Sequence, residues 1–156
     1  MSDSEWERMG DPYRLERFVA AQDRSGTYHR AVAELRAGRK QSHWMWFVFP
    51  QLAGLGSSPM AQEFAIGSLA EAQAYLAHPV LGPRLAECAR VLNAAADGVS
   101  ATEIFGPVDA MKLRSSMTLF AAAAPEEQPF GGGQALTDVL ARYFGGQPDQ
   151  ATLERL

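Results

Sequence analysis

The sequence predicts an all-α fold: one compact orthogonal bundle of about seven or eight helices. Apolar residues recur every three or four positions along most of the chain, which is the spacing of one face of an amphipathic helix. No two alternating apolar runs flank an Asn-Gly or Asp-Gly turn, so the sequence carries no hairpin signal. Its 156 residues, 47% of them hydrophobic and 21% charged, suit a single globular domain. We therefore expect one domain over residues 11–156, preceded by a polar, disordered tail over residues 1–10.

The first two helices have clear boundary signals. Asp11 followed by Pro12 predicts a helix start, because the carboxylate can cap the first amides and proline lacks the N–H that this position does not need. This helix should run to about Arg24, before a Ser-Gly break. The second should cover residues 27–37, with Gly38 as its left-handed C-terminal cap.

The next segment, residues 42–50 (SHWMWFVFP), is nearly all large and apolar. Periodicity cannot separate a buried strand from two turns of a buried helix here, because every face is hydrophobic. We favour a helix, since Ser42 is a good cap and Pro50 a good stop. Residues 51–58 (QLAGLGSS) then predict a loop, and residues 59–64 a short turn.

Two capping boxes organise the second half of the chain. Ser68 with Glu71, and Ser100 with Glu103, place an acidic residue three positions after a capping serine. The expected helices here cover residues 68–78, 81–98, 100–106, 108–124 and 134–144, and Asp149 caps a short terminal one.

Charge and cysteine content exclude several classes of protein. The net charge of −4 offers no source for the counterion release that drives nucleic-acid binding, so we expect no nucleic-acid partner. No run approaches the 18 or so apolar residues of a membrane span, and no secretory signal is present, so we expect no membrane partner and a cytoplasmic location. The single Cys88 lies in an apolar series and predicts a buried thiol.

Metal and serine-hydrolase chemistry are also disfavoured. His29, His43 and His78 lie far apart, with no second ligand at helical spacing, so we expect no metal and no cofactor. The chain lacks a Gly-x-Ser-x-Gly elbow after a strand. The glycines of residues 54–58 could present amides to a phosphate, but an ordinary turn explains them as well.

The aromatic segment is the first candidate for a binding site. On a helix, His43 and Trp46 share one face while Trp44 takes another, so one face can be core and the other can line a cleft that continues to Gln51. The alternative is a purely hydrophobic central helix with satisfied indoles and a core histidine.

A polar helix face is the second candidate. Asp109, Lys112 and Ser116 project together at i, i+3 and i+7, and Ser115 lies beside them. Lys112 can neutralise a carboxylate or phosphate, while Asp109 can act as a base, cap the helix or pair with Lys112. The alternative is a helix cap with a solvated salt bridge.

At these segments the chain resembles a bacterial family, the domain of unknown function family 1810, whose members sometimes carry the label calpastatin. The matching strings, which extend from about residue 13 to the end of the chain, include FVAAQ (18–22), SHWMWFVFPQ (42–51), GLG (54–56), AYL (74–76), IFG (104–106) and SSMTLF (115–120). The resemblance implies a small all-α domain and lends no activity.

Two functions remain open at this point. The first is a domain that binds or processes a small nucleotide-derived or ADP-ribose-like ligand, between the segment of residues 43–51 and the helix of residues 109–118. The ligand-binding candidates are Gln22, His43, Trp44, Trp46, Gln51, Lys112, Ser115 and Ser116. If a reaction occurs, a remote similarity to the NADAR family implies hydrolysis of a glycosidic bond, with Asp109 or Glu103 as the carboxylate. The second is a non-catalytic protein-interaction domain, with the aromatic segment as core or as partner anchor.

Overall fold

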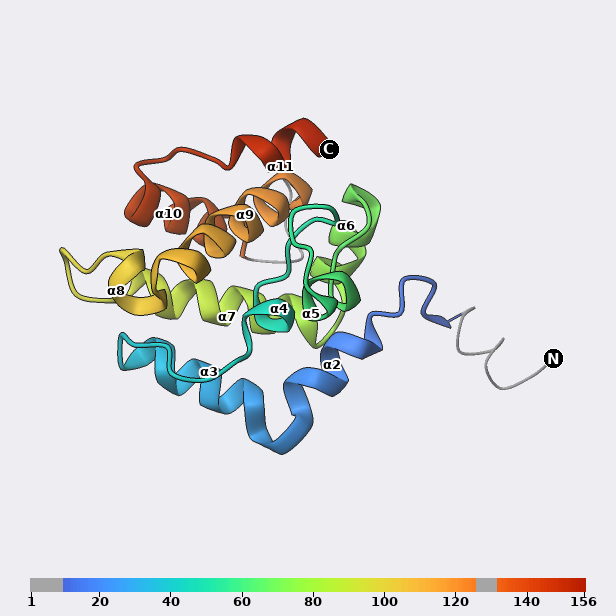
Figure 1. Ribbon diagram of the computed structural model, residues 1–156, viewed down its shortest axis with the longest axis horizontal. Coiled ribbons are helices and arrows are strands. Elements are labelled where there is room, and N and C mark those ends of the chain that lie inside the picture. The colour runs from blue at the N-terminus through green and yellow to red at the C-terminus, as the bar shows by residue number, and fades with distance from the viewer. Residues whose placement is uncertain (1–9, 126–131) are drawn as a thin grey trace.

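Two long helices, α7 (Leu81–Asn93) and α9 (Pro107–Ala123), form the centre of the molecule (Figure 1). The computed structural model describes residues 10–125 and 132–156. Helix α7 contacts α3, α6 and α10, while α9 contacts α6, α8, α10 and α11. The other elements are α2 (Glu16–Asp23), the 3-10 turn η1 (Arg24–Gly26), α3 (Thr27–Arg36), α4 (Met45–Val48), α5 (Pro59–Glu63), α6 (Leu69–Ala77), α8 (Ala101–Phe105), α10 (Gly133–Phe144) and α11 (Gln150–Arg155). The predicted all-α bundle is confirmed, and the described residues contain no strand.

The predicted serine caps form as expected. The Ser68 side chain accepts a hydrogen bond from the amide of Glu71 at 3.1 Å, and Ser100 accepts one from Glu103 at 3.1 Å. Asp149 caps α11 through the amide of Thr152, also at 3.1 Å. These helix starts depend on contacts within one turn, which is why the sequence predicts them well.

The first helix begins later than predicted. The Asp11 carboxylate does accept the amides of Leu15 and Glu16, at 2.7 and 2.9 Å. Arg14, however, has a φ of 55°, in the left-handed region, so regular helix starts only at Glu16. The predicted tail of residues 1–10 lies outside the described residues apart from Gly10.

The aromatic segment forms one helical turn instead of two. Trp44 before α4 and Phe49 after it have φ angles of −134° and −125°, which are not helical. Trp44, Met45, Phe47, Val48 and Phe49 are nevertheless all buried, as a core segment requires.

Helix α7 ends at Asn93, five residues before the predicted stop at Gly98. Side chains of α10 hold the residues at its end: the Tyr143 hydroxyl donates to the Leu92 carbonyl at 2.5 Å, and Arg142 donates to the Ala96 carbonyl at 3.1 Å. The last carbonyls of a helix have no amide partner unless the helix continues. Side chains of α10 supply donors to such carbonyls, so α7 can end here.

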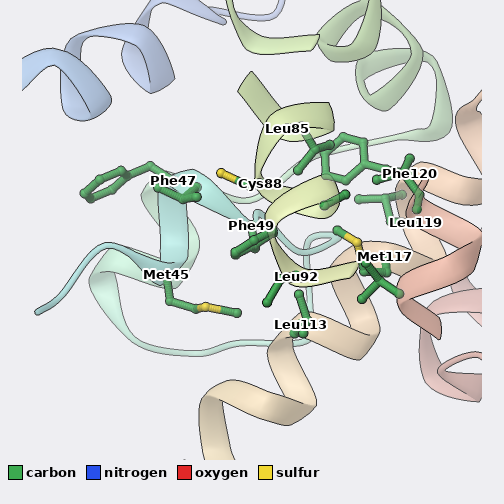
Figure 2. Packing of buried hydrophobic residues seen from close by; sticks show 14 of the residues in the cluster. Met45, Phe47, Phe49, Leu85, Cys88, Leu92, Leu113, Met117, Leu119 and Phe120 are labelled. Atoms are coloured by element: carbon green, nitrogen blue, oxygen red, sulfur yellow. The ribbon is translucent and has the colours of Figure 1, made fainter. Parts of the chain in front are cut away.

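One hydrophobic core runs between α4, α6, α7 and α9. Figure 2 shows Met45 and Phe49 among the side chains of Leu92 and Leu113, which come from α7 and α9. Cys88 is fully buried in this core, as predicted, and burial raises the pKa of its thiol to about 12. The core thus fixes α4 against α9, and with it the spacing of the residues that follow α4.

Candidate functional site

A cavity of about 230 Å³ lies where the end of the aromatic segment meets α9. Trp46 and Lys112 line it from α4 and α9, so the two segments chosen from the sequence do meet. Its other lining residues are Met45, Phe49, Gln51, Leu52, Ala53, Gly54, Gly56, Ala61, Gln62, Phe64 and Ala65. None of these is acidic.

The backbone of the cavity wall is held by an isolated parallel bridge. Leu52 pairs with Ile66, because the Ala53 amide donates to the Ile66 carbonyl at 2.8 Å and the Ile66 amide donates to the Gln51 carbonyl at 2.9 Å. The loop that the sequence left as an ordinary turn is therefore one side of a concave site.

A single arginine anchors residues 63–65, which include the lining residues Phe64 and Ala65. The Arg17 guanidinium donates to the carbonyls of Glu63 and Ala65, at 2.9 and 2.8 Å. It also pairs with Glu71 at 3.2 Å, with both side chains largely buried. These bonds tie the end of α5 and the residues that follow it to α2.

Trp46 and Lys112 form the chemically distinctive pair of the cavity. The Lys112 ammonium lies 5.5 Å from the centre of the Trp46 ring, within cation–π range. Trp46 is the one residue of α4 that is partly exposed, since Met45, Phe47 and Val48 are buried. An aromatic face beside a cation can accept a planar ring that carries negative charge.

Asp109 is shared between two lysines. One carboxylate oxygen lies 3.1 Å from Lys40, and the other lies 3.5 Å from Lys112. The Lys40 side chain is 8% exposed, so its ion pair with Asp109 is well shielded. One carboxylate thus balances two ammonium groups, which leaves this side of the cavity positively charged.

A buried glutamate shapes the loop that delivers Lys40 and the aromatic segment. The Glu34 carboxylate accepts the amides of Gln41 and Ser42, at 2.7 and 2.9 Å. It also accepts the Ser42 hydroxyl at 2.5 Å and the Trp44 indole N–H at 3.0 Å. Burial raises the pKa of Glu34, but these hydrogen bonds outweigh burial and lower it to about 2. Sequence reasoning missed this role, although Glu34 lies on the otherwise apolar face of its helix.

Three of the predicted ligand-binding residues line the cavity, and five do not. Trp46, Gln51 and Lys112 are lining residues. His43 is exposed at the surface and lines no part of the cavity. Trp44 is fully buried in the core, and its indole N–H donates to Glu34.

The other three predicted binding residues are also enclosed by the fold. Gln22 is 1% exposed, and its side-chain amide donates to the Phe47 carbonyl at 2.7 Å, so it links α2 to α4 inside the protein. Ser115 donates to Asp149 at 3.1 Å and thereby holds α11. Ser116 is fully buried, and its hydroxyl has no partner among the described residues.

The two carboxylates proposed for catalysis lie apart from the cavity lining. Asp109 borders the cavity only through Lys112, and both of its oxygens are engaged by lysines. Glu103 is exposed on α8 and is absent from the cavity wall. Its amide, not its carboxylate, takes part in the cap with Ser100.

The sequence did not predict Gln62 as a lining residue. Gln62 lies on α5, and its side chain donates to the Ser57 carbonyl at 3.0 Å.

Within residues 10–125 and 132–156, no three His, Cys, Asp or Glu side chains are grouped to hold a metal. In the same part of the chain, no helix is long and apolar enough to cross a membrane.

Fold and cavity together define a small all-α domain with an aromatic and cationic pocket. A family model described as a protein of unknown function (DUF1810) matches residues 12–156, and the chain belongs to this family. It is also similar to a crystal structure of the conserved hypothetical protein Rv1873 from Mycobacterium tuberculosis. The two are 54% identical with a TM-score of 0.85, and the match covers 94% of this chain and 98% of the other. No curated protein matches the chain.

Proposed function

We propose that this chain binds a small, negatively charged ligand with a planar ring in the cavity between α4, the loop of residues 51–56, α5 and α9. The observation that carries the proposal is the contact between Trp46 and Lys112 in the cavity lining, where the Lys112 ammonium lies 5.5 Å from the centre of the Trp46 ring. The ring would stack on Trp46, Lys112 would neutralise the anionic group, and the amides of Gln51 and Gln62 would bond the ring edge. Nucleotide-derived molecules combine these features, so they are the ligand class that we favour.

The size of the cavity limits how much of an ADP-ribose-like ligand it would enclose. Its volume, about 230 Å³, is below the roughly 300–1,000 Å³ of sites for drug-sized molecules. One ring with its immediate substituents suits this volume, and the rest of a larger ligand would lie outside the cavity.

Binding has more support than glycosidic hydrolysis. Hydrolysis would need two carboxyl groups on either side of the bond, about 5 to 9.5 Å apart. The cavity lining includes no acidic side chain, and lysines already engage both oxygens of Asp109. We therefore propose a binding domain in which Asp109 holds Lys112 in place.

A thermal-shift screen tests the proposal. The panel contains mononucleotides, nicotinamide nucleotides, ADP-ribose, sugar phosphates and free nucleobases. A ligand at about 100 times its Kd adds about 2.7 kcal/mol, or about 5 to 11 °C for a chain of this size. Replacing Lys112 by Met should abolish the shift, because Met keeps the aliphatic contact with Trp46 but not the charge.

The control is Arg36→Met, which removes an exposed cation from α3, away from the cavity lining. This variant should keep the full ligand shift. Lys112→Met should also leave the midpoint of the unliganded protein nearly unchanged, because a partly exposed ion pair contributes about 0 to 1 kcal/mol. If no compound shifts the midpoint of the natural protein, ligand binding in this cavity is refuted.

The interaction-domain alternative has two accessible surfaces. Most of the aromatic segment is buried in the core, so within residues 43–51 a partner would contact mainly His43, Trp46 and Gln51. Val108 and Met111 on α9 are 67% and 71% exposed, and a partner could contact these side chains. Met111→Glu would weaken such a contact and leave the ligand shift intact.

A further inference from the structure

A second cation lies at the rim of the cavity, on the last helix of the chain. The guanidinium of Arg155, in α11, lies against the backbone of Gly54, a lining residue. A methyl group at Gly54 would lie 2.6 Å from Nη1 and 3.2 Å from Cζ of Arg155. Arg155 therefore occupies the space that a side chain at position 54 would fill.

Polar contacts with α9 fix α11, and so Arg155, in this position. The Asp149 amide donates to Thr118 Oγ1 at 2.8 Å, and the Asp149 carboxylate accepts from Ser115 at 3.1 Å. The same carboxylate accepts the hydroxyl of Thr152, which is fully buried, at 2.6 Å. Lys112, one helical turn before Ser115 on α9, lines the cavity, and Arg155 lies against its lining residue Gly54.

The charge around the cavity is unbalanced. Lys112 shares Asp109 with Lys40, which lies closer to that carboxylate. Among the described residues, no acidic side chain forms an ion pair with Arg155. With no acidic lining residue, Lys112 and Arg155 are two cations that Asp109, which Lys112 shares with Lys40, balances only in part.

We propose that Arg155 and Lys112 together bind a phosphate monoester, which makes Arg155 a specificity residue of the cavity. This inference rests on the proposed function, because it names the anionic group of the same ligand. A phosphate monoester carries about −1.5 to −2 charges near pH 7, which matches two cations better than one carboxylate does. A guanidinium also offers two parallel N–H groups to phosphate oxygens, while an ammonium acts as a point charge.

The test compares phosphorylated and unphosphorylated forms of the same ring by isothermal titration calorimetry. The probes are AMP against adenosine, and nicotinamide mononucleotide against nicotinamide riboside, with nicotinate as a carboxylate without phosphate. At least one monophosphate should bind the natural protein tenfold or more tightly than its nucleoside and than nicotinate. Arg155→Ala should remove most of this difference without changing the affinity for the nucleoside.

Two further variants separate charge from structure. Arg155→Lys should keep part of the preference for phosphate, and the matched control Arg36→Ala should keep all of it. If Arg155→Ala fails to fold, Arg155→Gln takes its place, since the longer polar side chain preserves the contact with Gly54.

The outcomes distinguish the two proposals. If nucleoside and monophosphate bind equally well, and Arg155→Ala changes neither affinity, the role of Arg155 is refuted while the planar-ring site stands. If nicotinate binds as tightly as the monophosphates, a carboxylate is the preferred anion and the phosphate assignment fails. If none of the probes binds, the proposed function fails, and this inference fails with it.

Discussion

Replacing Glu34 by Gln tests how much the buried carboxylate contributes to the fold. The folded protein lowers the pKa of Glu34 from 4.5 to about 2, a change of roughly 2.5 units. At about 1.36 kcal/mol per unit, the folded state favours the ionised form by about 3 kcal/mol. Gln keeps a single carbonyl acceptor for four donors and leaves buried N–H or O–H groups unpaired, so we expect a loss of about 2 to 3 kcal/mol at neutral pH.

The direction of the pH dependence follows from the sign of the shift. Because the pKa is lower in the folded state, the stabilisation from Glu34 is complete above about pH 5 and decreases as the pH falls toward 2. The difference between the natural protein and Glu34→Gln should therefore be largest near neutral pH and shrink in acid. The natural protein at low pH should approach the stability of the variant.

Urea denaturation followed by circular dichroism, at several values between pH 7 and pH 3, measures this difference. In a separate thermal melt at neutral pH, the melting temperature should fall by about 5 to 10 °C, since 1 kcal/mol corresponds to about 2 to 4 °C at this size. Glu103→Gln is the matched control, because this glutamate is exposed and its carboxylate forms no hydrogen bond or ion pair with the residues that the structure describes. A difference that stays constant with pH, or that equals the control, would refute the reasoning.

Three further changes probe other parts of the fold. Cys88 should not react with Ellman's reagent at pH 8 in the folded protein, because the thiol is buried and burial raises its pKa to about 12. In denaturant it should react fully. Rapid labelling of the native protein would contradict this prediction. Gly82→Ala should lower the free energy of unfolding by several kcal/mol, because the new methyl group would overlap the Leu76 carbonyl oxygen. A urea midpoint equal to that of the natural protein would count against this prediction. Asp149→Ala should lower the free energy of unfolding by about 1 to 2 kcal/mol, because it removes the N-cap of α11 and the hydrogen bond from Ser115. The control Asp138→Ala changes an exposed aspartate and should have little effect.

The sequence predicts the features that depend on near neighbours. The caps at Ser68, Ser100 and Asp149 each involve a partner three residues away, and all three form. Lys112 could be chosen because a lysine on a polar helix face is visible in the helical spacing. The same spacing did not separate Trp46, which lines the cavity, from Trp44, which is buried. Local patterns carry this information without any knowledge of the tertiary structure.

Features that depend on distant contacts were missed. Arg155 reaches Gly54 across about one hundred residues of sequence, and no pattern around either residue indicates the contact. The early end of α7 likewise depends on Tyr143 and Arg142 of α10. For Glu34 a signal did exist, because a carboxylate on a buried helix face needs several donors to offset the cost of burial.

The polar attachment of α11 has a consequence for its motions. Its one buried side chain is that of Thr152, and Leu153 remains 38% exposed, so little apolar surface resists detachment of this helix. Local opening of α11 should therefore need much less free energy than global unfolding, and its amides should exchange hydrogen for deuterium early. A ligand that binds Arg155 would slow this exchange along the helix, which would make the last turns of the chain a reporter of occupancy in the cavity.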